Sequence, residues 1–216
     1  MHALYLHGFA SSSRSTKGSF LAEKFSEHGI TLTTPDFNEP DFSTLTITRM
    51  LSQVTDIIDT LSGPVVLIGS SLGGFVAVQS ALVRPGKVER MILLAPALDF
   101  SANRLRDLGD RGLEEWETSG QLNVFHYGYG RMVPVHYGLY ADAGRYECVN
   151  ARLDMPILIF QGRRDTAVNP EAVEQWSRSR PNVELHLLDD DHQLTGSLDY
   201  IWAETRRFLQ LEIADR

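Results

Sequence analysis

The chain has 216 residues, of which 43% are hydrophobic, and carries a net charge of −8. A chain of this length buries roughly 70% of its unfolded surface, enough for one domain with an ample core. The acidic balance, without any run of Lys or Arg, argues against a nucleic-acid partner or an anionic membrane surface. With no signal-peptide pattern, no apolar segment of transmembrane length and the single Cys148, we expect a cytoplasmic protein without membrane insertion.

Short apolar runs alternate with longer segments of helical periodicity. The expected strands are Ala3 to Leu6, Thr31 to Thr34, Val65 to Ile68, Met91 to Leu94, Pro156 to Phe160 and Val183 to Leu188. The expected helices are Gly18 to His28, Thr44 to Thr60, Phe75 to Val83, Pro170 to Arg178 and Leu194 to Leu211. This alternation predicts an α/β fold with a mostly parallel sheet of about six strands, helices on both faces, and functional residues beyond the carboxyl ends of the strands.

One motif contains a candidate reacting atom. Gly69-Ser70-Ser71-Leu72-Gly73 fits the pattern G-x-S-x-G between an apolar strand and a helical segment, which is typical of a nucleophile elbow. Such a turn strains the backbone of its central residue, so the positions two before and two after it must lack bulky side chains. We therefore predict that Ser71 is a nucleophile at a helix N-terminus, where negative charge is favoured.

The turn after the first strand supplies a second part of this site. His7-Gly8-Phe9 brings a backbone N–H close to the elbow. We predict that the N–H groups of Phe9 and Leu72 form an oxyanion hole, one from the turn after the first strand and the other from the residue after the nucleophile.

A serine nucleophile also needs a base and an acid, because an imidazole must take its proton and a carboxylate must fix the imidazole tautomer. Asp165 follows the strand Pro156 to Phe160, and His192 follows the last strand, so we predict the triad Ser71, His192 and Asp165. Asp99 is the main substitute for the acid. The neighbouring acidic residues, Asp189, Asp190 and Asp191, are typical of solvated loop charges.

The other histidines fit structural roles better. Packing or pocket lining is favoured over metal ligation for His126 and His136, which lie in aromatic stretches. Asp190-Asp191-His192 could suggest a metal, but no second ligand cluster has matching spacing. We predict no metal and no cofactor.

The motifs HGF, GSSLGG, GRRD and DDDH, in this order, resemble the α/β-hydrolase superfamily over essentially the whole chain. The segment His7 to Lys17, HGFASSSRSTK, is similar to the small bacterial serine esterases of the YqiA type. The resemblance implies a compact hydrolase of one domain, residues 1–216, without the two leading antiparallel strands of larger members.

The segment Asp99 to Asn150 departs most from a minimal hydrolase. It lies where the superfamily inserts its cap, so we expect a small helical cap whose aromatic side chains line a pocket above Ser71. An ordinary helical connection, whose rings only pack against the domain, is the alternative. The aromatic residues are Trp116, Phe125, Tyr127, Tyr129, Tyr137, Tyr140 and Tyr146.

These residues predict hydrolysis of a small-molecule carboxylic ester or thioester, with a short or medium acyl chain, through an acyl-enzyme on Ser71. A carbon–carbon bond hydrolase or lyase could use the same triad on a carboxylate substrate, which Arg14, Lys17 or Arg163 could bind. A non-catalytic binding protein on a hydrolase scaffold is the third possibility. The sequence makes no prediction of the oligomeric state.

Overall fold

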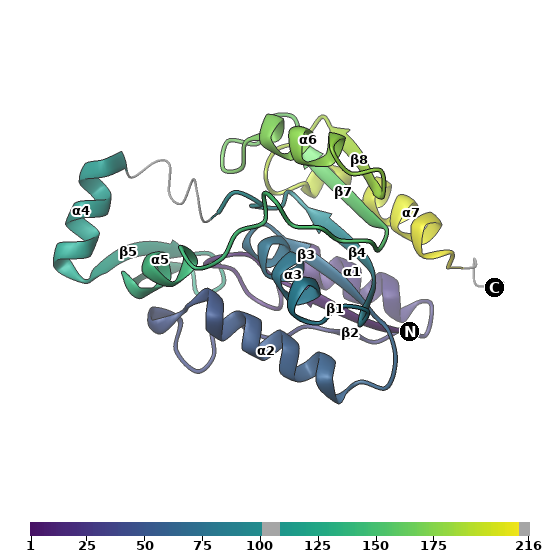
Figure 1. The fold of residues 1–216 in the computed structure, drawn as a ribbon, viewed down its shortest axis with the longest axis horizontal. Helices are drawn as coiled ribbons and strands as arrows, with labels where there is room; N and C mark the ends of the chain where they lie inside the picture. The colour runs from purple at the N-terminus through teal and green to yellow at the C-terminus, as the bar shows by residue number, and fades with distance from the viewer. Residues whose placement is uncertain (101–108, 212–216) are drawn as a thin grey trace.

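A computed structural model describes residues 1–100 and 109–211. Its centre is a six-stranded parallel sheet in the order β2-β1-β3-β4-β7-β8 (Figure 1). The strands are β1 (His2–Leu6), β2 (Leu32–Thr33), β3 (Val65–Ser70), β4 (Val88–Leu94), β7 (Ile157–Gly162) and β8 (Val183–Leu188). Every residue of β3 and β7 is buried, as expected for strands covered on both faces, whereas the edge strand β8 is half-buried.

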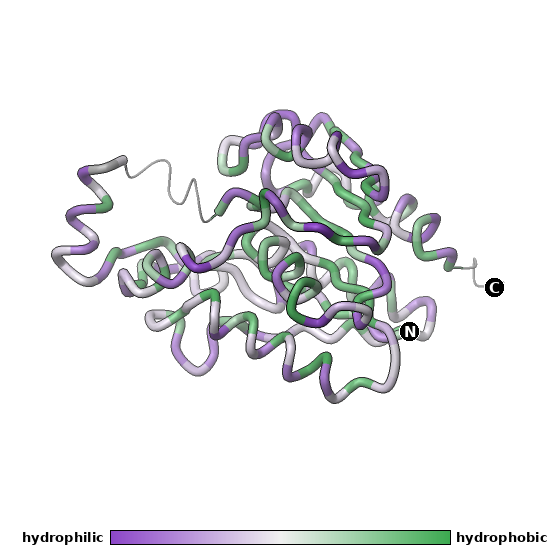
Figure 2. The backbone as a smooth tube through the Cα atoms, in the orientation of Figure 1, coloured by the Kyte–Doolittle hydropathy of each residue, from purple (hydrophilic) through white to green (hydrophobic). Residues whose placement is uncertain are grey.

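Helices cover both faces of this sheet, as the alternation of strand and helix predicts. One face packs against α1 (Thr16–Ser26) and α7 (Leu198–Leu209), and the other against α2 (Ile47–Thr60), α3 (Leu72–Val83) and α6 (Pro170–Arg178) (Figure 1). Successive residues of β1 alternate between the two cores: Ala3 and Tyr5 contribute to the first, Leu4 and Leu6 to the second. The hydrophobic colouring of the central strands in Figure 2 follows from this double coverage.

Most predicted elements are present, with shifted ends. Helix α3 begins at Leu72, directly after the candidate nucleophile, and not at Phe75. Gly73 and Gly74 read as turn residues in the sequence, but they lie in the first helical turn, where their small size lets the helix approach other backbone segments. A short 3₁₀ turn at Thr195–Ser197 likewise delays the start of the C-terminal helix to Leu198.

The segment between β4 and β7 contains more than helices. Between α4 (Gly109–Ser119) and α5 (Gly138–Ala143) lies an antiparallel hairpin of β5 (Gln121–His126) and β6 (Arg131–His136), which the sequence analysis did not predict. Alternating burial along the hairpin explains it: Leu122, Val124 and His126 face inward, as do Val133 and Val135. Residues 101–108 of the predicted cap lie outside the described residues.

The hairpin projects toward the side of the sheet where the parallel strands end (Figure 1). The N–H of Tyr127, at its tip, donates a 2.8 Å hydrogen bond to the carbonyl of Ala10, just beyond the end of β1. A segment more than 100 residues downstream is thereby fixed to the loop that follows the first strand. Among the described residues, none of the helices combines the length and the apolar character that a membrane crossing requires.

Candidate active site

Ser71 lies at the sharp turn between β3 and α3. Its backbone has φ 52° and ψ −118°, a left-handed conformation that costs a non-glycine residue of order 1–3 kcal/mol and persists only where the surroundings enforce it. Two hydrogen bonds contribute to this: the Ser71 N–H donates to Leu94 O at 3.0 Å, and the Gly74 N–H donates to Ser71 O at 2.9 Å. The strained backbone places the hydroxyl at the N-terminus of α3, where the helix dipole favours negative charge.

The two glycines of the elbow leave no room for side chains. A Cβ atom at Gly69 would lie 2.5 Å from the carbonyl oxygen of Gly73, and one at Gly73 would overlap the carbonyl of Leu6. This confirms the predicted need for small residues two before and two after Ser71. The elbow therefore packs directly against the end of β1.

The turn after β1 contacts the elbow as well. A Cβ atom at Gly8 would lie 3.2 Å from the Cβ of Ser71, which places the Gly8–Phe9 peptide beside the candidate nucleophile. Within residues 1–100 and 109–211, neither the Phe9 N–H nor the Leu72 N–H donates to a protein group. Neither predicted oxyanion donor is therefore engaged by a described residue.

His7 fixes this turn. Its side chain is buried, its Nδ1 lies 2.9 Å from Gly8 O, and its Nε2 accepts a 3.0 Å hydrogen bond from the Phe37 N–H. A carbonyl oxygen can only accept, so Nδ1 is the donor in the contact with Gly8 O. The HGF motif alone does not reveal this role of His7, because the partner Phe37 lies 30 positions further along the chain.

The structure brings Asp165 and His192 together. Nδ1 of His192 lies 2.8 Å from Oδ2 of Asp165, and the carboxylate side chain is fully buried. Since an ionised carboxylate only accepts, Nδ1 carries the proton and Nε2 keeps a lone pair that can take a proton. Asp165 is thus an acid in direct contact with this histidine.

Further donors hold the Asp165 carboxylate. Oδ1 accepts the N–H groups of Ala167 and Val168 at 2.9 and 2.8 Å, and Oδ2 accepts Nε2 of Gln161 at 2.9 Å. Burial raises the pKa of Asp165, but the hydrogen bonds from His192, Val168 and Gln161 outweigh it and leave this pKa below its ordinary value. The carboxylate is therefore ionised at neutral pH. Gln161 is a supporting residue that sequence reasoning missed, because only the loop geometry reveals its contact.

Lys17 supports the loop that carries His192. This side chain of α1 is buried, and its Nζ donates to the carbonyls of Gln193 at 3.0 Å and His192 at 3.4 Å. Burial lowers the pKa of Lys17 to about 8, against the attraction of Asp165, Asp191 and Asp190. A buried ammonium that faces backbone carbonyls does not fit the predicted role of Lys17 as a partner for a substrate carboxylate.

The acidic run before His192 also differs from its prediction as solvated charge. Asp189 and Asp191 are exposed, but Asp190 is buried. Its carboxylate accepts the hydroxyl of Ser197 and the N–H of Asp191, both at 2.8 Å. Asp190 therefore shapes the loop between β8 and α7.

Ser71, Asp165 and His192 follow β3, β7 and β8, so all three lie beyond the carboxyl edge of the same parallel sheet. This is the edge at which open α/β sheets bind ligands. The predicted site residues therefore share one region of the fold, although they span 122 positions of the sequence.

Two aromatic residues of the insertion, Trp116 and Phe125, differ strongly in exposure. Trp116 is 1% exposed, donates its indole N–H to Val135 O at 3.0 Å and packs against Tyr137 and Tyr140, so most of its ring packs within the insertion. Phe125 is 47% exposed on the outward face of β5. His126 is buried and hydrogen-bonded, in line with its predicted structural role, and His136 is exposed.

One cluster in the described part of the chain has the composition of a metal site. One ligand atom from each of Glu184, His186 and Glu204 lies within 4.8 Å of the others, at the outer edge of the sheet. Arg207 forms ion pairs with both carboxylates, and His186 also bonds to the Tyr200 hydroxyl at 2.8 Å. These contacts account for the cluster as a surface ion-pair network.

Comparison with curated proteins gives partial relatives. The chain is 29% identical over 127 residues to the human protein "Palmitoyl-protein thioesterase ABHD10, mitochondrial", a match covering 57% of this chain and 42% of that protein. It is 38% identical over 66 residues to "Lipase LipV" of Mycobacterium tuberculosis, covering 30% of this chain and 25% of the lipase. The chain thus spans less than half the length of these relatives.

Solved structures share the fold over nearly the whole chain. Alpha/beta hydrolase domain-containing protein 10 from mouse matches 97% of this chain and 89% of its own, with a TM-score of 0.82 at 20% identity. Est1E from Butyrivibrio proteoclasticus, solved with ferulic acid bound, matches 99% and 89%, with a TM-score of 0.78 at 20% identity. The six-stranded sheet with helices on both faces is therefore the α/β-hydrolase fold.

The family comparison spans almost the same residues as the fold. The model of the "Uncharacterised protein family (UPF0227)" matches residues 2–209, and the chain accordingly belongs to UPF0227, within the α/β-hydrolase fold.

Proposed function

We propose that the protein is a serine hydrolase that cleaves small-molecule carboxylic esters or thioesters through an acyl-enzyme on Ser71. The observation that carries this proposal is the 2.8 Å contact between His192 Nδ1 and the buried Asp165 carboxylate, on loops that leave the same sheet edge as Ser71. That contact leaves Nε2 of His192 as a base, which a serine nucleophile requires.

The proposed reaction has two halves. His192 Nε2 removes the proton of the Ser71 hydroxyl, whose oxygen attacks the carbonyl carbon, and the N–H groups of Phe9 and Leu72 stabilise the resulting oxyanion. His192 returns the proton to the leaving alcohol or thiol. The second half repeats these steps with water, which releases the acid and restores the serine hydroxyl.

The names of the relatives support the substrate class. One is called a palmitoyl-protein thioesterase and the other a lipase, so both the thioester and the ester are represented. For this chain we propose a short to medium acyl chain, because the insertion is small. We further infer that residues 1–216 form one domain and that Asp99 to Asn150 caps its active site.

A carbon–carbon bond hydrolase or lyase is the alternative with the same triad. Its carboxylate substrate would need a cationic partner, and burial removes Lys17 from the predicted candidates. Arg14 and Arg163 are exposed. An ester or thioester needs no such partner, so the geometry favours the first proposal.

The test is a panel of p-nitrophenyl esters from acetyl to palmitoyl, run beside acyl-CoA thioesters of the same chain lengths. Wild type is expected to prefer a short or medium chain, whereas highest activity on palmitoyl substrates would contradict the proposed acyl length. Ser71→Ala should retain the fold and lose several orders of magnitude in kcat.

Ser70→Ala is the matched control, because it changes the neighbouring hydroxyl. A fluorophosphonate probe should label Ser71 alone in wild type and in Ser70→Ala. Labelling at Ser70, or no labelling of folded wild type, would show that the elbow does not supply the nucleophile.

A further inference from the structure

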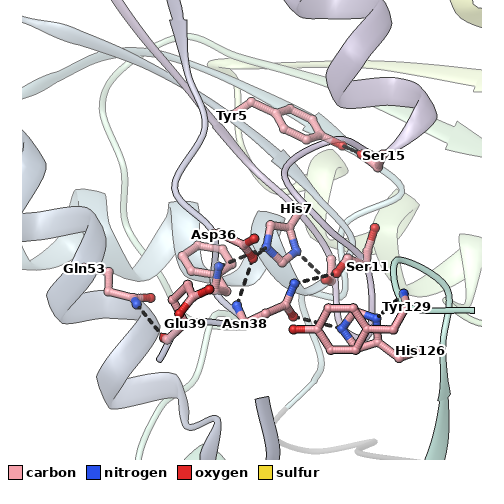
Figure 3. Close-up of polar contacts among 12 residues, drawn as sticks. Tyr5, His7, Ser11, Ser15, Asp36, Asn38, Glu39, Gln53, His126 and Tyr129 are labelled. Atoms are coloured by element: carbon pink, nitrogen blue, oxygen red, sulfur yellow. Dashed lines mark hydrogen bonds and ion pairs between the residues drawn. The ribbon is translucent and has the colours of Figure 1, made fainter. Parts of the chain in front are cut away.

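His126 is a buried titratable group for which the proposed reaction has no use. It is the last residue of β5, at the tip of the hairpin, and is completely buried. Figure 3 shows its imidazole next to Asn38 and Tyr129, at one end of a polar network that continues through Asn38 to Ser11 and Asp36. Nε2 lies 2.9 Å from Asn38 Oδ1, Nδ1 accepts the Tyr129 N–H at 3.2 Å, and Asn38 Nδ2 donates to Ser11 O at 2.9 Å.

Every proton in this network has one consistent place. Ser11 O can only accept, so the NH₂ group of Asn38 must face it, and the amide oxygen of Asn38 then faces His126. Nε2 of His126 must therefore carry the proton, which leaves Nδ1 to accept the Tyr129 N–H. The neutral imidazole satisfies both of its partners, Asn38 Oδ1 and the Tyr129 N–H. Protonation at Nδ1 would set two donors against each other.

Aromatic rings enclose the imidazole and extend the contact to Phe9. The Tyr129 ring stacks on His126 with centroids 3.8 Å apart, and the Phe42 ring meets its edge at 4.6 Å. Phe42 in turn lies 5.5 Å from the ring of Phe9. His126 is thus linked by ring packing to the side chain of the residue whose N–H is the proposed oxyanion donor.

The hairpin tip also holds the backbone beyond Phe9. Ala10 has φ 51°, an unfavourable conformation for a residue with a side chain, which the surrounding contacts must enforce. The Tyr127 N–H donates to Ala10 O, and a Cβ atom at Gly128 would lie 3.0 Å from the Cβ of Ser12. The loop 9–12 is therefore held from outside by the hairpin.

We propose that His126, through Asn38 and the hairpin tip, is a positioning residue that holds the loop 9–12 and so keeps the Phe9 N–H in place for the oxyanion. This inference rests on the proposed hydrolase function. It gives the insertion a role in turnover as well as in covering the site.

The charges around the imidazole favour the neutral form that this role needs. Burial lowers the pKa of His126 and the charge of Arg131 lowers it further, while Asp36 opposes them. The ring therefore stays uncharged at neutral pH, and its Nδ1 keeps accepting the Tyr129 N–H.

The test compares His126→Ala, Asn38→Ala and the double variant with wild type on p-nitrophenyl acetate. Loss of the hydrogen bond between His126 and Asn38, which we call the anchor, should lower kcat by about 10-fold to 100-fold, because a small displacement of an oxyanion donor weakens transition-state stabilisation. KM should change by no more than a few-fold. The double variant should be no slower than either single variant, since both remove the same connection. If the losses in kcat of the two single variants add in the double variant, the two residues act independently, which would contradict the proposal.

Trp116→Phe is the matched control, because it removes one buried hydrogen bond of the insertion, to Val135 O, without a contact to the loop 9–12. At a comparable drop in melting temperature it should keep the wild-type kcat. If kcat falls equally in the control, His126 contributes only general stability and the proposal is wrong.

Hydrogen exchange of the peptide that spans residues 8–13 tests the anchor without any turnover. Exchange there should speed up in His126→Ala and in Asn38→Ala, but not in Trp116→Phe. Unchanged exchange in both of the first two variants would overturn the positioning role. Inactive wild type that no fluorophosphonate labels would instead contradict the proposed function, and the exchange data would still decide the role of His126.

Discussion

The Nδ1–H of His7 donates to the carbonyl oxygen of Gly8 at 2.9 Å, and this oxygen belongs to the same peptide unit as the N–H of Phe9. A peptide unit is planar, so a bond that fixes its oxygen also fixes the direction of its hydrogen. The Phe37 N–H holds the other nitrogen of the same ring. The first residue of the HGF motif thus acts on the proposed oxyanion hole through backbone geometry.

The first prediction follows from this arrangement. Phe9→Ala should lower kcat far less than Phe9→Pro, because it keeps the proposed main-chain donor and loses only the ring contact with Phe42. Phe9→Pro removes that donor and should lower kcat by about 10²-fold or more. Steady-state kinetics on p-nitrophenyl acetate, with melting temperatures to verify the fold, make the comparison. Equal effects of the two substitutions would exclude the Phe9 N–H as a donor.

The second prediction concerns the two candidate acids. Asp165→Asn keeps the shape of the side chain but no longer stabilises the correct tautomer of His192, so kcat should fall by up to about 10⁴-fold. Asp99→Asn, its matched control, should have a mild effect, since Asp165 is the carboxylate in contact with the imidazole. Should Asp99→Asn be the damaging change, the assignment of the acid to the loop after β7 would be wrong.

The third prediction concerns stability against pH at Lys17. Its pKa is about 8 in the folded state and about 10.4 in an unfolded chain, so between these values the unfolded state binds more protons. The contribution of Lys17 to the free energy of unfolding must therefore rise with pH in this window, by up to about 1.4 kcal/mol per pH unit. Lys17→Met removes this dependence.

Denaturant melts at pH 7 and pH 9.5 measure the effect. Wild type should gain stability relative to Lys17→Met as the pH rises. The control is the partly exposed Lys24, whose pKa is raised by its bond to Glu27, so wild type should show no such gain relative to Lys24→Met. A constant difference between wild type and Lys17→Met would show that the folded protein holds this proton as tightly as the unfolded chain.

The fourth prediction tests the proposed cap with two neighbouring residues of β5. Val124 lies half-buried on the inner face of the hairpin, and Phe125 is exposed on the outer face. If the inner face borders the acyl pocket, Val124→Phe should shorten the preferred acyl chain by filling space, and Phe125→Ala should leave the preference unchanged. A lower melting temperature of Val124→Phe with an unaltered acyl profile would indicate that the insertion only packs against the domain.

Local features of the active site were predictable from the sequence, because they depend on short segments. Gly69 and Gly73 mark a turn that only small residues can form, and Asp165 and His192 directly follow apolar strands. The parallel sheet follows from the alternation of strand and helix.

Contacts between distant segments were not predictable. Lys17 reaches carbonyls 175 and 176 residues away, and a lysine in a sequence is expected to be exposed. The role of His126 depends on the hairpin, whereas the sequence was interpreted as a helical cap. The alternating apolar residues, Leu122 with Val124 and Val133 with Val135, are the sequence signal that could have indicated two strands.

The hairpin strands pair only with each other, in a sheet separate from the six-stranded one. The hydrogen bonds between β5 and β6 therefore do not depend on the strand register of the six-stranded sheet. Lengthening these two strands, or changing their exposed side chains, would leave the six-stranded sheet unaltered. The tip has no such freedom, since His126 bonds to Asn38 and the Tyr127 N–H donates to the Ala10 carbonyl. Changes along the two hairpin strands therefore need not disturb the loop 9–12, whereas changes at the tip act on it directly.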